Sequence, residues 1–76
     1  MTNLNPRIQR DEFRAFVGKK VMIGTMSYHY VSGRVEELDQ PGNLLKVRVG
    51  GQLVLVPLDQ VATIQEAPES QAEYVK

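Results

Sequence analysis

The spacing of short apolar segments constrains this chain most. Between residues 20 and 65, segments in which apolar and polar residues alternate are separated by brief polar turns. Parallel neighbours in a sheet need a crossover of a dozen or more residues, and these turns are too short to provide one. The segments therefore predict an antiparallel meander, and a strongly bent meander of five short strands closes into a small barrel. The predicted fold class is mainly β, a small SH3-like five-stranded antiparallel barrel with an N-terminal α-helix.

Local signals mark the strands and the points where they bend. The predicted strands are centred on Val21–Ile23, Val31–Val35, Leu45–Val49, Leu53–Val56 and Val61–Ile64. Glu36-Glu37 interrupts the alternation before Leu38, which predicts a bulge or a sharp bend. Gly33 inside a strand points the same way. Gly50-Gly51 is typical of a two-residue hairpin turn.

A short helix is predicted before the first strand. Phe13, Phe16 and Val17 follow the i, i+3, i+4 spacing of one apolar helix face. The helix begins either at the cap signal Asn5-Pro6 or at Asp11, and it ends near Val17.

A chain of 76 residues forms a single domain. Residues 1–5 are predicted to be flexible and residues 6–65 to form the barrel. Residues 66–76 contain Pro68 and Ser70 and show no apolar periodicity, so a disordered acidic tail is predicted there. A domain this small, with no cysteine to form disulfides, commonly gains stability by association between copies.

Composition narrows the class of protein. The formal net charge is zero, with 9 basic and 9 acidic residues, which disfavours a wholly basic nucleic-acid module. The single histidine and the lack of cysteine argue against a zinc site within one chain. The longest apolar run, Leu53–Leu58, is far shorter than the about 20 residues that span a bilayer. With no secretory signal layout at the N-terminus, a cytoplasmic location without membrane contact is expected.

Catalytic chemistry has little support in the residues. His29 is the one side chain that titrates near neutrality without perturbation. Glu36-Glu37 and Asp39 supply carboxylates, but adjacent strand residues point to opposite faces, and a solvated edge is the favoured interpretation. The sequence therefore predicts a protein that is not an enzyme and that needs no cofactor.

Several of these stretches resemble motifs of the Sm-like family, which includes Sm, LSm and Hfq proteins. Gly18–Ile23, Gly33–Val35 and Leu38–Leu45 are similar to the first motif of the family, including its Asp-to-Asn spacing at Asp39 and Asn43. Val54–Ile64 resembles the second motif, an apolar strand, a short turn and another apolar strand. The resemblance implies a helix followed by five strands, and a homo-oligomeric ring in which the fourth strand of one copy pairs with the fifth of the next. It also implies binding of RNA, with one base held per subunit.

The chain departs from the family where the base would be held. The two positions that stack the base in Sm-like proteins are occupied here by Pro41 and Pro57, and a proline supplies no cation and no charge-assisted hydrogen bond. Asn43 remains as a candidate base reader. The alternative for Asn43 is an Asx turn that starts the third strand. RNA binding is thus predicted through a non-standard site.

A weaker resemblance connects the chain with PRC-barrel domains, through Gly18–Val21, Gly33–Leu38, Val47–Gly51 and Leu55–Val61. It implies an alternative function, a protein-interaction or scaffold module that binds no nucleic acid.

Three further groups of residues are candidate nucleic-acid contacts. The aromatic group could stack on bases, and the basic groups could attract phosphates. The competing interpretations are packing in the barrel for the first group and a solvated surface for the others. The groups are Tyr28, His29 and Tyr30; Lys19 and Lys20, with Arg34; and the helix residues Arg7, Arg10 and Arg14.

The fourth strand is the candidate interface because it is apolar on both faces. Such a strand is a sticky edge if it is left open, and pairing with the last strand of another copy would cover it. The alternative is that the helix and barrel cover both faces within one chain. The predicted interface residues are Leu53, Val54, Leu55, Val56, Val61, Thr63 and Ile64.

Overall fold

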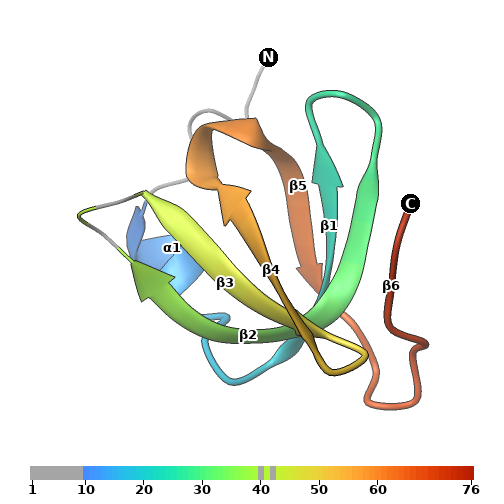
Figure 1. Cartoon of the computed structure of the whole chain (residues 1–76). Coiled ribbons are helices and arrows are strands. Elements are labelled where there is room, and N and C mark those ends of the chain that lie inside the picture. Colours follow the sequence, from blue (N-terminus) through green and yellow to red (C-terminus); the bar gives the residue numbers. More distant parts are fainter. Residues whose placement is uncertain (1–9, 40, 42) are drawn as a thin grey trace.

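The chain folds into one antiparallel sheet that follows a short helix (Figure 1). The structure is a computed structural model, and it describes residues 10–39, 41 and 43–76. The elements in chain order are α1 (Arg10–Arg14), β1 (Lys20–Thr25), β2 (Tyr30–Asp39), β3 (Leu44–Val49), β4 (Gln52–Pro57), the 3-10 turn η2 (Leu58–Gln60), β5 (Val61–Glu66) and β6 (Tyr74–Val75).

The strand order confirms the predicted meander and leaves the sheet open. Hydrogen-bonded neighbours follow the order β4-β3-β2-β1-β5, and every pairing is antiparallel. The sheet is strongly curved and wraps around its core (Figure 1). β4 and β5 stand at opposite ends of this order, so each presents one edge that no described strand pairs.

The bulge and the hairpin predicted from the sequence are both present. The register between β2 and β3 shifts between Val35 and Glu37, which leaves Glu36 as the additional residue. Gly50 and Gly51 have φ angles of 54° and 90°, and this turn joins β3 to β4. Gly33 is required for a different reason, because a Cβ there would collide with the backbone carbonyl oxygen of Arg48.

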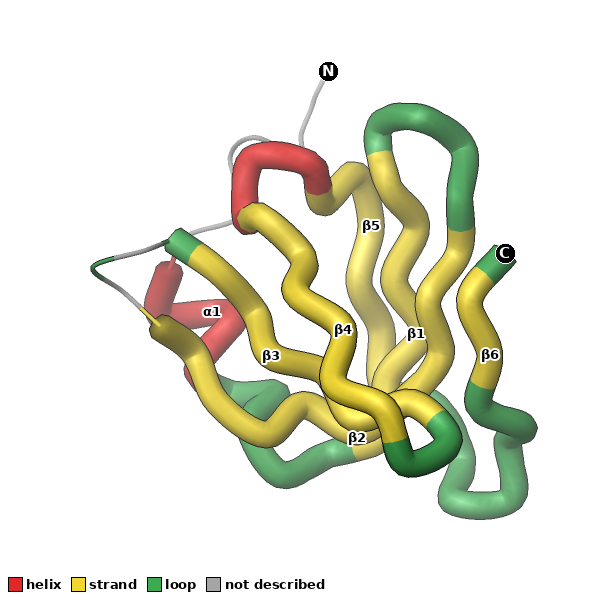
Figure 2. The backbone as a smooth tube through the Cα atoms, viewed as in Figure 1, coloured by secondary structure: helices red, strands yellow, loops and turns green. Residues whose placement is uncertain are grey.

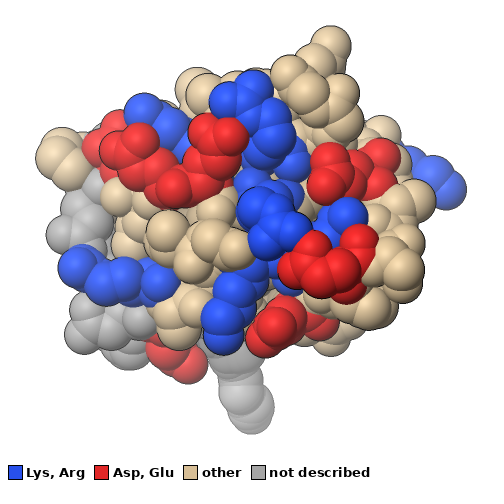
Figure 3. Space-filling view, turned by 90° about the horizontal axis from the view of Figure 1, so that it is seen from below, with Lys and Arg blue, Asp and Glu red and all other residues tan. Residues whose placement is uncertain are grey.

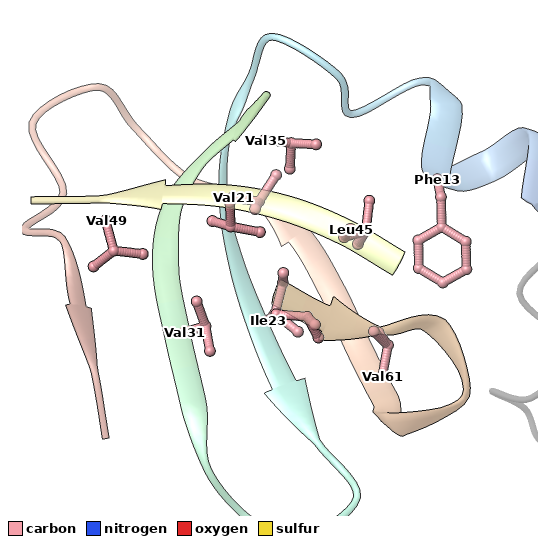
Figure 4. Packing of buried hydrophobic residues seen from close by; sticks show 10 residues of the cluster. Phe13, Val21, Ile23, Val31, Val35, Leu45, Val49 and Val61 are labelled. Carbon is pink, nitrogen blue, oxygen red and sulfur yellow. The ribbon is translucent and has the colours of Figure 1, made fainter. Parts of the chain in front are cut away.

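The core lies on the concave side of the curved sheet. β3 shows the period of two most clearly, since Leu45, Val47 and Val49 are buried and the residues between them are partly exposed. The largest fully buried apolar side chains come from three adjacent strands (Figure 4), and they are Ile23, Leu45, Val21, Val35 and Val47.

The N-terminal helix ends earlier than predicted. α1 ends at Arg14, and the chain continues in turns in which the amides of Phe16 and Val17 bond to carbonyls three residues earlier. Phe13 is buried and Phe16 packs against the core, but Val17 is 40% exposed because the tighter turns rotate it away from the apolar face. The possible helix start at Asn5-Pro6 lies outside the described residues.

The C-terminal segment, residues 67–76, differs from the expected disordered tail. It turns back beneath the sheet and runs along β2 as β6 (Figure 2). Backbone bonds hold both of its ends: the Ala67 amide donates to Lys20, and Tyr30 and Lys76 exchange two bonds of 2.8 Å. Its order rests on polar contacts, which apolar periodicity does not reveal.

No helix in the described part of the chain combines the length and the apolar character that a membrane crossing requires.

Candidate functional site

The predicted interface strand β4 covers its inner face and leaves its outer face open. Val56 pairs with Leu45 of β3 and is buried, and Val54 pairs with Val47 and is half-buried, because both point into the core. Leu53 and Leu55 point the other way, and they are 44% and 52% exposed. The alternative in which the helix and barrel cover both faces of this strand within one chain is therefore wrong.

The predicted interface residues on β5 are divided in the same way. Val61 is buried, and Ile64 packs partly buried against the core. Thr63 is exposed and lies on the outer face, with its hydroxyl next to Gly24 of β1. The backbone edges of β4 and β5, rather than all seven side chains, are therefore the features available to another chain.

A shallow apolar groove follows the inner side of β4. It has a volume of about 210 Å³ and lies between β4 and the hairpin that joins β1 to β2. Val31, Val54 and Val56 supply its apolar wall, while Ser27 and Gln60 lie at its polar margin. The unpaired edge of β4 thus adjoins a groove that apolar side chains can fill.

Asn43 lies on a rim that also includes η2 and the β1–β2 hairpin. The Leu58 amide donates a bond of 2.8 Å to the Asn43 carbonyl, and the Met26 amide donates one of 2.8 Å to Gln60. Asn43 has a φ angle of 54°, a left-handed conformation that asparagine tolerates better than most residues. Its backbone therefore forms the turn before β3, and its exposed position places it next to Leu58.

The three consecutive aromatic residues do not form one stacking platform. Tyr28 is 90% exposed at the hairpin tip, with a φ angle of 66°. His29 is exposed, and its Nδ1 lies 3.1 Å from the Lys76 carbonyl oxygen. Tyr30 lies over Gly24, where an added Cβ would come within 3.4 Å of the tyrosine ring. Tyr28 is the member of the three best placed to stack on a base.

The predicted basic ridge on the helix can be placed only at Arg14. Arg7 lies outside the described residues, and so does the side chain of Arg10. Arg14 is exposed and lines a wide depression beside Glu36 and Glu37. The mixed charge around Arg14 agrees with the interpretation of Glu36 and Glu37 as part of a solvated edge.

Lys19 and Lys20 contact the C-terminal half of the chain. Lys19 Nζ lies 3.7 Å from a carboxylate oxygen of Glu66. Lys20 Nζ lies 3.2 Å from Glu73 and donates a bond of 3.1 Å to the Glu69 carbonyl. The Lys20 side chain is only 9% exposed, an unusual degree of burial for a lysine.

The predicted group of Lys20 and Arg34 belongs to a transverse row of three cations on the outer face, whose third member, Arg48, was not predicted. Lys20 pairs with Arg34 in the β1–β2 register, and Arg34 pairs with Arg48 in the β2–β3 register. Lys20, Arg34 and Arg48, here called the cationic row, thus lie side by side on three neighbouring strands. In Figure 3, Lys and Arg form a band through the middle of the face, with Asp and Glu on both sides. The alternation on each strand was visible in the sequence, but the cross-strand register was not.

Carboxylates form ion pairs with the cationic row, and these contacts lower the pKa values of two of them, Glu36 and Glu73. The Gly50 backbone amide, at 2.7 Å, and the Lys20 ammonium group lower the pKa of Glu73. The bond from Arg48, at 2.6 Å, lowers the pKa of Glu36, and the same contact raises the pKa of Arg48. With their pKa values lowered, Glu36 and Glu73 are ionised at neutral pH.

The structure therefore places two members of one predicted basic group, Lys20 and Arg34, directly opposite each other on neighbouring strands. Within the described residues, no group of three or more potential ligands is placed to hold a metal ion. Comparison of the chain with protein-family models, with curated proteins and with solved structures finds no match.

Proposed function

We propose that this chain is a non-catalytic, Sm-like binding protein that works as a homo-oligomeric ring and holds single-stranded RNA at the rim formed by Asn43 and η2. The observation that carries the proposal is β4, an edge strand with two exposed leucines beside an apolar groove. β5 of a second copy is the proposed occupant of that edge. Its addition would join the sheets of neighbouring copies edge to edge and leave no open edge in a closed ring.

The strand order supports this assembly. β4 and β5 terminate the same sheet, so a contact between β4 of one copy and β5 of the next is heterologous and closes only through a ring of copies. Exposed apolar strand edges are uncommon in stable monomers because they template association. A small chain without disulfides also gains stability from such contacts.

The position of Asn43 supports RNA as the ligand. Asn43 and η2 are joined by the Leu58–Asn43 backbone bond, so each copy would present the same short rim to the ring. The amide of Asn43 can bond a base edge, and Tyr28, exposed at the hairpin tip, offers an aromatic face. Repetition of weak contacts around a ring raises the total affinity.

The assembly is tested by measuring mass in solution. Light scattering at micromolar concentration should give several times the mass of the 76-residue chain. Leu55→Lys should lower that mass because a charge on the exposed face of β4 opposes pairing. Val17→Lys is the matched control, since it charges an exposed apolar residue away from that edge. A monomeric wild-type chain, or equal dissociation by both variants, would overturn the ring.

RNA binding is tested by fluorescence polarisation with uridine-rich and adenine-rich oligonucleotides over a series of salt concentrations. Binding should weaken as salt increases, since phosphate contacts release counterions. Asn43→Gly should abolish any preference between the two RNAs, and glycine tolerates the positive φ angle, so the turn should survive. An unchanged preference assigns Asn43 to the turn alone, and no binding at low salt removes RNA from the proposal.

A protein-interaction module is the second candidate. The apolar groove beside an unpaired strand favours it, because an extended peptide can add to a sheet edge and place alternate side chains in such a groove. This function predicts that the assembled protein has no affinity for RNA at any salt concentration.

A further inference from the structure

We propose that the cationic row binds the phosphate backbone of single-stranded nucleic acid, and that the C-terminal segment, residues 67–76, covers this second site in the free chain. The row crosses the middle of the outer face, whereas Asn43 lies at the far end of β2 and β3. It is therefore a separate surface, and it requires neither the ring nor the rim.

The row is unfavourable without anions. Like charges directly opposite each other on neighbouring strands are destabilising, and here two such contacts are consecutive, Lys20 with Arg34 and Arg34 with Arg48. Neighbouring strands lie about 4.8 Å apart, so the three charges form a compact cationic line. Such a line is suited to an anion that carries several charges along its length.

The C-terminal segment supplies two of the three carboxylates that face the row. Glu73 lies 3.2 Å from Lys20 and Glu69 pairs with Arg34. The third carboxylate, Glu36 on Arg48, comes from the bulge in β2. The segment thus places acidic groups where the phosphates of a bound strand would lie.

The attachment of the segment is polar and shallow. None of residues 67–76 is buried, and β6 pairs with β2 over two residues, Tyr74 and Val75. Val75 is 54% exposed, so the segment contributes no residue to the buried core. The Arg34–Glu69 pair is exposed and contributes little net stability, whereas the Lys20–Glu73 pair is partly buried. A polyanion with more charge than two glutamates would compete for both cations without opening the sheet.

The first experiment removes charge from the segment. Polarisation with a uridine 20-mer should show that Glu69→Gln/Glu73→Gln binds at least about 5-fold tighter than the control at low salt. Two newly available cations should steepen the slope of log affinity against log salt by about 1.4, the value for two added contacts on a single strand. The control, Glu12→Gln/Glu37→Gln, changes net charge equally at positions outside the segment and the row.

The second experiment asks whether the gain belongs to the row. Arg34→Gln, added to the Glu69→Gln/Glu73→Gln variant, should reduce the gain in affinity and remove about half of the added salt slope, about 0.7, because Lys20 remains available. An equal gain in the control, or a gain that Arg34→Gln leaves unchanged, overturns the proposal. So does a double variant that loses stability without gaining affinity, because the segment would then be a structural clamp only. Glu69→Gln alone, at a position 71% exposed, gives the same test if the double variant unfolds.

Asn43→Gly separates the two proposals. In the Glu69→Gln/Glu73→Gln background it should leave the gain in affinity and slope unchanged, while removing the preference for one RNA over another. If the rim fails as an RNA site, the gain still appears. If the row fails, the preference still depends on Asn43.

Discussion

The edge strand β4 and the outer face under the C-terminal segment differ in which side chains they expose. On β4, Leu53 and Leu55 are apolar and exposed, with no described part of the chain above them. On the outer face of β1 and β2, Lys20 and Ser32 are polar and buried, and the C-terminal segment lies over them. The usual relation between polarity and exposure is therefore reversed in both regions.

The two regions differ in the kind of interaction that covers, or would cover, their side chains. Covering β4 would bury apolar surface, which is insensitive to charge and favours lasting contact. The cover over Lys20 and Ser32 consists of hydrogen bonds and ion pairs, which salt and pH weaken. One region is thus suited to assembly and the other to reversible exchange.

The largest effect is expected within β4 itself. Val56→Lys should cost more than about 3 kcal/mol of unfolding free energy, because it places an unpaired charge in the core. Leu55→Lys should leave the stability of the isolated chain within about 0.5 kcal/mol. Denaturation followed by circular dichroism measures both. Equal losses would mean that both faces of β4 are covered in one chain, and the contrast with the outer face would fail.

A smaller effect is expected at Ser32, which is fully buried beneath the C-terminal segment. Its hydroxyl donates a bond of 2.9 Å to the Ala72 carbonyl. Ser32→Ala should lower stability by about 1 kcal/mol, the usual net value of one hydrogen bond. It should also accelerate amide exchange in residues 67–76. Ser27→Ala, at an exposed hydroxyl, is the control and should change neither quantity. Unchanged exchange in Ser32→Ala would show that the cover does not depend on this bond.

The pH dependence should separate the two regions further. The pKa of Glu73 is lowered in the folded chain by the Gly50 amide and Lys20, so its contribution is present above the ordinary glutamate pKa. That contribution is lost as pH falls through the lowered value. The Gly50 amide resonance should therefore titrate at a pH below the ordinary glutamate pKa of 4.5. Glu73→Gln should remove this transition. A transition that persists in that variant would assign it to another group.

The smallest effect is expected for Leu53→Thr. Threonine is well suited to a strand, and Leu53 is 44% exposed, so stability of the isolated chain should change by less than about 0.5 kcal/mol. Oligomer mass should nevertheless fall if this face meets a second copy. A loss of several kcal/mol in dilute protein would reveal a covered leucine and weaken the distinction drawn between the two regions.

The sequence predicted the elements whose signals are local. The alternation in β3, the Gly50-Gly51 hairpin and the bulge near Glu36 each depend on a few adjacent residues, and all three are present. β6 was missed because its order comes from contacts such as that between Ser32 and Ala72, which lie 40 residues apart. The helix end was misplaced because the amides of Phe16 and Val17 form tighter turns than a regular helix.

The candidate sites were less predictable because they depend on register. Each strand taken alone contributes a single cation to the row, and only the pairing of three strands aligns Lys20, Arg34 and Arg48. The exposure of Leu55 likewise depends on β4 lying at the end of the sheet order, which the residues of β4 do not reveal. Local patterns therefore identified the strands but not the surfaces that several strands form together.

The additional residue in β2, Glu36, lengthens the strand without changing which of its other side chains face the core. With Glu36 present, Glu37 pairs with Lys46 and Leu38 with Leu45, so each side chain lies on its proper face. Substituting Glu36 would keep the bulge and remove only the carboxylate on Arg48. Deleting it would instead join Val35 directly to Glu37 in an uninterrupted alternation, which preserves the inward and outward positions of every other residue. β2 is thus a strand whose curvature a homologue could lose by a single codon deletion without exchanging its buried side chains.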